Sequence, residues 1–575
     1  MSLLETATSL TERYRDLVVA HQPVEATAIG LHDGDHELPD LDPAAVDGWT
    51  REVSGLLREV EAVRVGIPDD ATGDDREAAG DLELLALALD AERFQLEERR
   101  SLETDPLAAI GVAASGIHEL LRRTDLPPAD QARLVAAAAA RARRIPHFVE
   151  QAGRLLASSP EPHLQVARGR LAGLVGLVRD ELPARADAAG ADVGEARDAG
   201  AAAADALEAY AALLDELAEE PAADWRLGPE QHARALRTAL GSPMSAQEVE
   251  RRAGSWLEHV TEVLAEHAGA FLTDRGADVP TDAAERTRAA LALLSTETVD
   301  RTALVEEATR AVDAAHAWAE AEGLVDLPPR ELLTITEVPR FLQGVAVAFI
   351  TAPPAFEPES GCTYYLSPVP DEWDEEQARS FLAEYHRPAL HDLALHEAVP
   401  GHWVQLEHAA RHPRLARRWL ISSAFAEGWA VYVERVAVER GFGAGIAGLD
   451  PVAYRLSQAK LELRLATNAL LDVGLHAGDL DDDGAMELLV GRALQEQAEA
   501  AGKLVRGKVT AGQLCSYFVG GEELRDLADA ERVRAGGALD LRGFHAKVLS
   551  HGTPTTATVA AALADPSAEV RRPFA

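Results

Sequence analysis

The stretch HDLALHEAVPGHWVQLEH, residues 391–408, decides the fold of the central part of this 575-residue chain. It carries His396 and Glu397, and His402 follows six residues after the first histidine. In an ideal helix that spacing turns His402 about 240° away from His396, so a straight helix cannot bring both imidazoles onto one ion. Between them, Pro400 disfavours helical geometry at the preceding residue, and Gly401 accepts backbone angles forbidden to other residues. We therefore predict a break or bulge that swings His402 back toward His396.

The pair His396-Glu397 opens like the motif H-E-x-x-H, in which two histidines bind zinc and the glutamate serves as general base. Catalytic zinc usually takes three protein ligands and keeps one position for water, so a third ligand should lie elsewhere. Glu427 offers one, because it is a carboxylate in the small and apolar helical segment SAFAEGWAVYVE (423–434), where burial without a cation is costly. Gly428 is expected to let this helix pack closely against the helix that carries His396.

These two segments, HEAVPGH and about 25 residues later SAFAEGWAVYVE, resemble the bacterial DUF885 family of zincin-like proteins. The broader resemblance is to gluzincins, whose ligands are two histidines and a glutamate on a following helix. Further segments similar to the family are GCTYYLSP, AYRLSQAKLELR, LLDVGLH, SYFVGGEELRDL and FHAKVLSHGTP, which together span about residues 360 to 555.

The resemblance implies that His396, His402 and Glu427 hold one zinc ion per chain and that Glu397 is the catalytic base. The same donors also suit other divalent transition metals. Gluzincins often place an aspartate one turn beyond the ligand glutamate to orient a histidine, and here that position is Val431. Orientation of the ligands must then come from elsewhere, and the candidates are Asp392 and Glu434.

Several other residues are candidates to handle a substrate. A series of polar residues recurs every four positions through an apolar helical stretch: Lys460, Arg464, Asn468, Asp472 and His476. This series is either a ladder of paired surface charges or a substrate-binding face. In the second case Arg464 would hold a substrate carboxylate, and His476 a carbonyl or water near the metal.

Aromatic residues and a second histidine extend this set. Tyr364 and Tyr365 lie in a strand-like run that either packs in the core or lines the site as an edge strand able to pair with an extended peptide. Tyr517 and His545 are candidates to stabilise an oxyanion, and Tyr454 is a weaker candidate of the same kind.

The composition excludes several classes of partner. Hydrophobic residues make up 47% and charged residues 26% of the chain, as in globular proteins, and the formal net charge is −41. Such an acidic surface repels nucleic acid and anionic membranes. No apolar run approaches the roughly 18 residues that a membrane span needs, and Met1 to Ala20 lacks the pattern of a signal peptide, so a cytoplasmic location is expected.

The pattern of elements predicts a predominantly α-helical α+β protein. Ala- and Leu-rich segments with helical spacing fill much of the chain. Short β-branched and aromatic runs at 332–339, 345–356 and 361–370 predict one small sheet just before the metal motif. We expect a zincin-like helical body in which residues 1–325 form one wall of a deep cleft and residues 326–575 form the metal-binding half.

Together these features favour a metal-dependent hydrolase that cleaves short peptides, as an oligopeptidase, dipeptidase or carboxypeptidase. Hydrolysis of a non-peptide amide, or peptide binding without catalysis, are the alternatives. The sequence does not indicate an oligomeric state.

Overall fold

The computed structural model describes residues 1–68, 70–123, 126–219, 223–338, 348–369, 373–565, 568 and 570–575. The chain forms two compact units. Unit 1 comprises Met1–Trp225 with Pro354–Glu357, and unit 2 comprises Arg226–Pro353 with Pro358–Ala575. Residues 226–325, which the sequence-based division places in the N-terminal half, therefore pack with the metal motif in unit 2. The chain is 71% helical with one three-stranded sheet, which confirms the predominantly helical α+β class.

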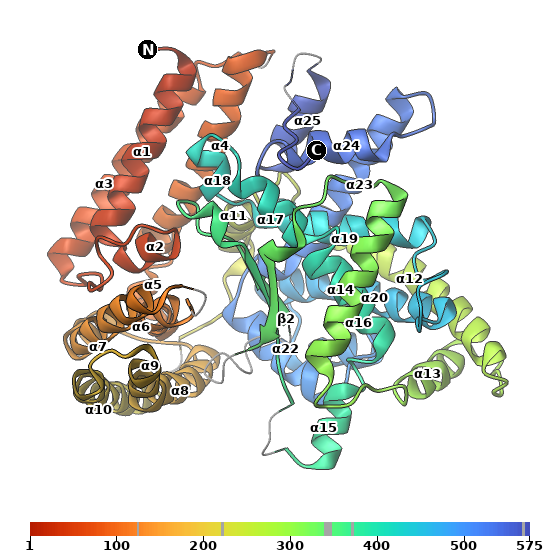
Figure 1. Cartoon of the computed structure of the whole chain (residues 1–575), viewed down its shortest axis with the longest axis horizontal. Helices are drawn as coiled ribbons and strands as arrows, with labels where there is room; N and C mark the ends of the chain where they lie inside the picture. Colours follow the sequence, from red (N-terminus) through yellow and green to blue (C-terminus); the bar gives the residue numbers. More distant parts are fainter. Residues whose placement is uncertain are drawn as a thin grey trace. The chain divides into compact units, whose positions relative to one another are not determined.

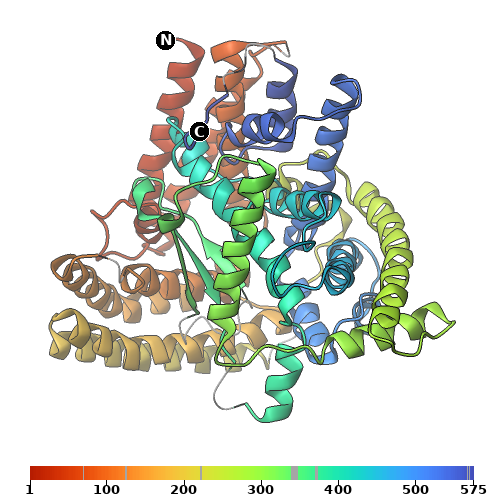
Figure 2. The ribbon, with the colours of Figure 1, turned by 45° about the vertical axis from the view of Figure 1, so that its right-hand side comes forward.

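Unit 1 is built from helices alone within the residues described for it. Its elements are α1 (Leu3–His21), α2 (Pro23–Ala28), α3 (Pro43–Arg64), α4 (Gly73–Arg93), η1 (Phe94–Glu98), α5 (Ser101–Thr104), α6 (Pro106–Leu121), α7 (Pro128–Leu155), α8 (Glu161–Gly176), η2 (Leu177–Glu181), α9 (Leu182–Ala189) and α10 (Val193–Leu217). Helices α1, α3 and α4 pack together, and α7 to α10 form a second group that lies side by side in Figures 1 and 2.

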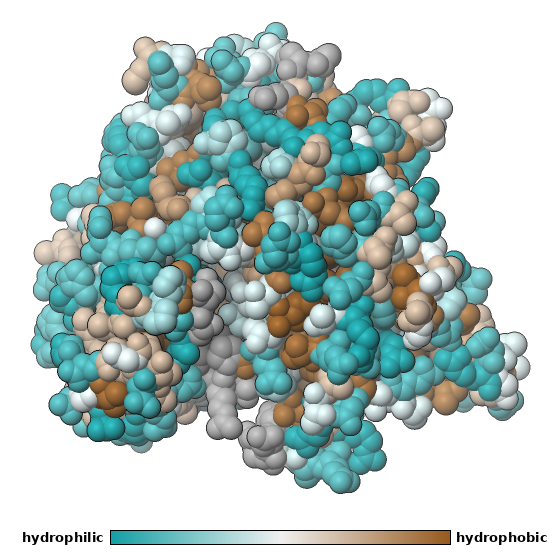
Figure 3. Space-filling view, in the orientation of Figure 1, coloured by the Kyte–Doolittle hydropathy of each residue, from teal (hydrophilic) through white to brown (hydrophobic). Residues whose placement is uncertain are grey.

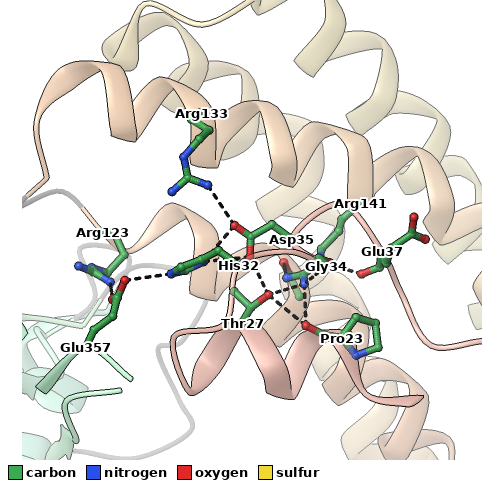
Figure 4. A network of polar contacts seen from close by, with 11 residues as sticks. Pro23, Thr27, His32, Gly34, Asp35, Glu37, Arg123, Arg133, Arg141 and Glu357 are labelled. Carbon is green, nitrogen blue, oxygen red and sulfur yellow. Dashed lines mark hydrogen bonds and ion pairs between the residues drawn. The ribbon is translucent and has the colours of Figure 1, made fainter. Parts of the chain in front are cut away.

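The segment Pro354–Glu357 belongs to unit 1 because polar contacts hold it there. His32 Nε2 lies 3.1 Å from Glu357 Oε1, and its Nδ1 lies 3.0 Å from Asp35. Arg123 also pairs with Glu357, and the backbone N–H of Phe356 donates to Ile29 O. Figure 4 shows this network together with the buried Arg141, whose guanidinium donates to carbonyl and hydroxyl oxygens around it.

Unit 2 contains the sheet and the remaining helices. Its helices are α11 (Gly228–Leu240), α12 (Ala246–Asp274), α13 (Ala283–Leu294), α14 (Leu304–Glu322), α15 (Glu375–Leu382), α16 (Arg387–Leu393), α17 (His402–Ala410), α18 (Leu415–Trp419), α19 (Ser423–Glu439), α20 (Pro451–His476), α21 (Asp482–Met486), α22 (Gln497–Val509), α23 (Ser516–Arg534), α24 (Leu541–Leu549) and α25 (Thr556–Ala564). Short 3₁₀ or π-helical turns are η3 (Arg330–Leu332), η5 (Pro358–Ser360), η6 (Ala394–Ala398), η7 (Glu487–Arg492) and η8 (Gln513–Cys515).

The three predicted β segments form one sheet. Its strands are β1 (Leu333–Glu337), β2 (Ala348–Thr351) and β3 (Cys362–Leu366), in the order β1-β3-β2. Strand β3 runs parallel to β1 and antiparallel to β2. The positions 339, 345–347 and 370 of the predicted runs lie outside the described residues. In Figures 1 and 2 the sheet lies beside α14, which contacts β1.

The core of unit 2 surrounds the metal motif. Trp403 and Trp429 are fully buried, and they share one hydrophobic cluster with Tyr364 and Tyr454. This cluster joins β3, η6, α17, α19 and α20, so the elements that carry the motif are fixed by the largest buried side chains. Removing such side chains from water is the main favourable contribution to folding.

Two glycines set the closest helix contact of this core. A Cβ at Gly428 in α19 would overlap the backbone of Gly520 in α23, and a Cβ at Gly520 would overlap the carbonyl oxygen of Ala424. The prediction that Gly428 permits close packing is therefore confirmed, but the expected partner was wrong. The glycine lets α19 approach α23 instead of the helix that carries His396.

The surface is consistent with the acidic composition. On the face shown in Figure 3, hydrophilic residues predominate and apolar residues occur in scattered patches. Among the described helices, we find none with the length and apolar character required to cross a membrane.

Candidate metal centre

The helix that delivers His396 breaks at the predicted place. Helix α16 continues into the π-helical turn η6, Val399 then adopts an extended conformation (φ −126°, ψ 116°), and α17 begins at His402. A Cβ at Gly401 would overlap the carbonyl oxygens of Leu395 and His396, so this turn requires glycine. The indole of Trp429 donates to Pro400 O at 2.8 Å and fixes the turn against α19. The predicted break at Pro400-Gly401 is confirmed.

This turn brings three potential ligands together. The rings of His396 and His402 are 4.8 Å apart between centroids. Glu427 Oε2 lies 3.6 Å from His396 Nε2 and 3.4 Å from His402 Nε2. Two ligand atoms about 2.0–2.1 Å from a tetrahedral zinc are separated by about 3.3 Å, so these distances match the span that one ion requires.

The donor set has two further properties of a metal site. Glu427 Oε2 is buried, and within the described part of the chain it has no hydrogen-bond partner, which is costly for a carboxylate oxygen unless a cation binds there. His396 Nδ1 lies 2.5 Å from Glu434 Oε1. That contact leaves Nε2 facing Glu427 and His402, as in metal sites where a carboxylate orients the ligand histidine. The residues present therefore fit one divalent transition-metal ion.

The pKa values of the two glutamates at the cluster, Glu427 and Glu397, are shifted in opposite directions. Burial raises the pKa of Glu427, but the imidazoles of His396 and His402 outweigh it and lower the pKa to about 2. Burial raises the pKa of Glu397, while the two imidazoles oppose that shift. One carboxylate is thus held as an anion among the ligand atoms, and the other is made more basic than an ordinary glutamate.

Glu397 lies beside the cluster and does not supply a ligand atom to it. It follows His396 in η6 and is 8% exposed. Its charge contributes to raising the pKa of Tyr364, although burial is the larger cause, so the two side chains are neighbours. The Tyr364 hydroxyl is buried and has no hydrogen-bond partner in the described structure.

Tyr517 lies at the cluster on the first turn of α23. Its ring stacks on His396 at 6.5 Å between centroids. The negative charge of Glu427 is the first cause that raises the pKa of Tyr517, with burial second, while a hydrogen bond with Arg506 lowers it. Of the candidates for an oxyanion donor, Tyr517 is the one that the structure brings to the metal cluster.

His545 and Tyr454 lie in the core outside the ligand set. Both ring nitrogens of His545 are used, Nδ1 with Leu324 O at 2.8 Å and Nε2 with the Tyr432 hydroxyl at 3.1 Å, and the side chain is completely buried. The fully buried Tyr454 donates to Asp392 Oδ1 at 3.3 Å. Of the two candidates to orient a ligand, Glu434 therefore contacts His396, whereas Asp392 accepts from Tyr454.

The polar residues that recur every four positions on α20 do not form one substrate-binding face. Arg464 pairs with Glu384 at 2.8 Å and Glu499 at 2.9 Å, which neutralise its charge. His476 Nε2 lies 2.7 Å from Gly507 O and stacks near His232 in a buried region. The series is also not an exposed ladder, because Asn468, Asp472 and His476 are buried.

The tyrosine-bearing strand is central rather than at an edge. Strand β3 carries Tyr364 and Tyr365 and pairs with β1 on one side and β2 on the other. The expectation that this strand adds an extended peptide was therefore wrong, because both sides of its backbone are already paired within the described sheet. Tyr365 stacks on Phe349 of β2 at 5.1 Å between centroids.

Sequence reasoning missed two cations of α22: Arg506, which neighbours Tyr517 beside the cluster, and Lys503, which neighbours Arg506. The segment KLVRGK, residues 503–508, concentrates positive charge in a chain of net charge −41 and lies shortly before SYFVGG. That local excess is the signal that could have identified them.

Two solved structures share the fold over almost the whole chain. A candidate lipoprotein of unknown function from Shewanella oneidensis has a TM-score of 0.78 and 24% identity, covering 97% of this chain and 99% of its own. A candidate lipoprotein from Colwellia psychrerythraea has a TM-score of 0.76 and 16% identity, covering 97% of this chain and 98% of its own. At these identities the likeness shows the fold alone.

Searches of functionally characterised proteins add no further relative, since no curated protein matches the chain. The family described as "Bacterial protein of unknown function (DUF885)" matches residues 23–563. The match thus extends through the N-terminal half, well beyond the segments between about residues 360 and 555 that carry the sequence resemblance. By this match over most of its length, the chain belongs to the DUF885 family of bacterial proteins.

Proposed function

We propose that this protein is a zincin-like metallopeptidase that cleaves peptide bonds of short peptides. The observation that carries the proposal is the convergence of His396, His402 and Glu427, whose ligand atoms all lie within 4.8 Å of one another, with Glu397 immediately beside them. Two histidines and a glutamate are a ligand set of catalytic zinc, and such sites keep one position open.

In this proposal the three ligands hold the ion, and Glu434 keeps His396 in the orientation that presents Nε2. A bound zinc ion supplies Lewis acidity to the scissile carbonyl and to water. The carboxylate of Glu397 accepts the proton of the attacking water and passes it to the nitrogen of the leaving amine. Its buried setting, which raises its pKa, strengthens it as a base.

Tyr517 would stabilise the charge that develops on the carbonyl oxygen. Its hydroxyl is a donor beside the ligand cluster, and an oriented donor at a developing oxyanion is among the strongest contributions to catalysis. Its ring is roughly parallel to that of His396, with 6.5 Å between the ring centroids.

Short substrates are favoured because the ligand side chains are largely covered. The side chains of His396, His402 and Glu427 are 15%, 11% and 24% exposed. A flexible peptide can reach such atoms, whereas the backbone of a folded protein is held in its own secondary structure. Oligopeptidase, dipeptidase and carboxypeptidase modes all satisfy this condition.

A panel of di- to hexapeptides tests the proposal. The zinc-loaded protein is expected to release fragments whose masses identify cleaved peptide bonds. Cleavage should stop when a chelator removes the metal, return when zinc is restored, and be absent from Glu397→Gln. Cleavage of non-peptide amides alone, or binding of peptides without any metal-dependent cleavage, would contradict it.

A further inference from the structure

Helix α22 carries two cations that form no ion pair with any acidic side chain of the described residues. Lys503 and Arg506 are three residues apart, so both lie on the same face of the helix. Both are partly buried, and among the described residues neither forms an ion pair. A partly buried cation without a counter-ion is unfavourable, which distinguishes this pair from ordinary surface charges.

Three neighbouring cations, by contrast, have acidic partners. Glu384 binds both Lys460 and Arg464, and Glu499 takes a second contact with Arg464. On α22 itself, Lys508 pairs with Asp482 at 2.7 Å. Of the described cations in this region, Lys503 and Arg506 are the two without an ion-pair partner.

Arg506 connects this charge to the candidate metal centre. Arg506 lowers the pKa of Tyr517, so the two side chains are neighbours, and the ring of Tyr517 stacks on that of His396. A chain of neighbouring side chains thus leads from the candidate ligand His396 through Tyr517 and Arg506 to Lys503. A peptide whose scissile bond is at the metal would extend its next atoms past Tyr517 toward Arg506.

We propose that Arg506, supported by Lys503, binds the C-terminal carboxylate of the substrate, so that the enzyme removes residues from the C-terminal end of short peptides. This inference rests on the proposed peptidase function, which it narrows to a carboxypeptidase or dipeptidase mode. Arginine suits the role because its planar guanidinium can bind both oxygens of a carboxylate.

The lowered pKa of Lys503 is consistent with the binding of an anion beside it. Burial is the first cause that lowers the pKa of Lys503, to about 7, and the charges of Arg464 and Arg506 add to it, whereas Glu499 and Glu384 oppose it. An additional carboxylate would restore the charged form of the lysine. The site thus lacks a negative charge, which the C-terminal carboxylate of a peptide would supply.

Cleavage of matched peptides tests the inference on the zinc-loaded full chain. The substrates are Ala-Ala-Ala with a free C-terminus, Ala-Ala-Ala-amide and Ala-Ala-Glu-amide, in which the only carboxylate is on a side chain. Wild-type protein is expected to prefer the free acid. Arg506→Met should lower kcat/KM for the free acid by at least about tenfold more than for Ala-Ala-Ala-amide, because loss of the contact with Tyr517 affects both substrates alike.

Control variants separate carboxylate binding from general damage. Arg506→Lys should retain part of the preference, and Lys503→Met should weaken it less than Arg506→Met. Lys508→Met removes a paired cation of the same helix and should leave the preference intact. Equal cleavage of acid and amide, unchanged by Arg506→Met, would overturn the subsite but leave the peptidase proposal standing.

Peptide binding to the zinc-loaded Glu397→Gln protein, measured by calorimetry, distinguishes the two failures. Tighter binding of the free acid that is lost in Arg506→Met supports the subsite even if wild-type protein cleaves no peptide. The subsite would be overturned if the free acid does not bind, or if acid and amide bind alike. Ala-Ala-Glu-amide binding as tightly as the free acid would show recognition of a side chain and overturn the C-terminal assignment.

Discussion

Glu434 Oε1 lies 2.5 Å from Nδ1 of His396, one ring atom away from the nitrogen that faces Glu427. Both glutamates come from α19 and are seven residues, about two turns, apart, so a single helix carries one candidate ligand and the carboxylate that contacts another. Arg435 binds Glu462 and Glu522 and ties this helix to α20 and α23. The position of α19 therefore sets both the place of the candidate ligand Glu427 and the contact of Glu434 with His396.

Glu434→Gln is expected to weaken zinc binding without removing a ligand. Loss of the carboxylate that orients a ligand histidine typically costs about 10- to 100-fold in metal affinity. A competitive zinc titration measures the change, and Glu439→Gln, an exposed position on the same helix, is the control. Unchanged affinity in Glu434→Gln would show that His396 is held by other contacts.

The purified protein is expected to carry about one transition-metal ion per chain. Elemental analysis after mild purification, followed by zinc titration of the metal-free protein, gives the stoichiometry. His402→Ala should reduce the affinity strongly, because only the Pro400-Gly401 turn places that imidazole near Glu427. If His402→Ala bound zinc as tightly as the wild type, the ligand set would be misassigned.

Glu397→Gln should separate catalysis from metal binding. It keeps the size of the side chain and removes the base, so turnover should fall by at least roughly 100-fold while metal content and thermal stability stay close to the wild type. Glu427→Ala should instead weaken metal binding, and excess zinc should partly restore its turnover. Full activity in Glu397→Gln would exclude this residue as the base.

The sequence predicted the parts of the site that depend on local rules. The break at Pro400-Gly401 follows from the backbone preferences of those two residues, and Glu427 was identifiable as a carboxylate in an apolar helix. The family is confirmed, and so is the predominantly helical class with a small sheet. The deep cleft, the cytoplasmic location and the exclusion of nucleic acid stay predictions.

The substrate residues were harder to predict because distant contacts decide their roles. Arg464 is neutralised by Glu384 and Glu499, which lie 80 and 35 residues away in the sequence. Tyr364 and Tyr365 lie in a central strand because β3, the last strand in sequence, inserts between the first two. The residue type of His545 made it a candidate oxyanion donor. Its hydrogen-bond partners Leu324 and Tyr432, however, come from elements that no local sequence pattern links to it.

Unit 1 is expected to lose local stability at alkaline pH through His32. Hydrogen bonds with Asp35 and Glu357 raise the pKa of His32 to about 9, while burial opposes the shift. Because the folded pKa is above the unfolded value of about 6.5, the contribution is complete below about pH 6.5 and is lost as the pH rises through 9. Screening at this partly exposed site limits it to roughly 1–2 kcal/mol.

Hydrogen exchange of the amides at 26–36 and 354–357 measures this effect, since the contacts in Figure 4 hold these two segments together. After correction for intrinsic exchange rates, protection should fall between pH 6.5 and 9 in the wild type. His32→Gln should show lower protection at pH 6.5 and little dependence on pH above it. A pH dependence that persists in this variant would assign the transition to another group.

Gly428→Ala is expected to destabilise unit 2 and to weaken the metal site together. The new Cβ would overlap the backbone of Gly520, which is not the flexible end of a side chain, so α19 or α23 must shift. Overpacking of this kind costs about 1–3 kcal/mol. Because Glu427 precedes Gly428 and Glu434 is on the same helix, a shift of α19 also moves a candidate ligand and the group that contacts His396.

Gly254→Ala is the matched control, since Gly254 is in the interior of α12 and, apart from the local backbone of that helix, no atom of the described residues lies within 4 Å of its added Cβ. There the change should stabilise the helix by about 0.5–1 kcal/mol. Urea denaturation of the metal-free proteins and zinc titration of each variant measure the two effects separately. If Gly428→Ala lowers the free energy of unfolding, Gly254→Ala raises it, and only Gly428→Ala weakens zinc binding, the contact between α19 and α23 sets the geometry of the metal centre. Equal zinc affinity in both variants would show that the ligands are held independently of that contact.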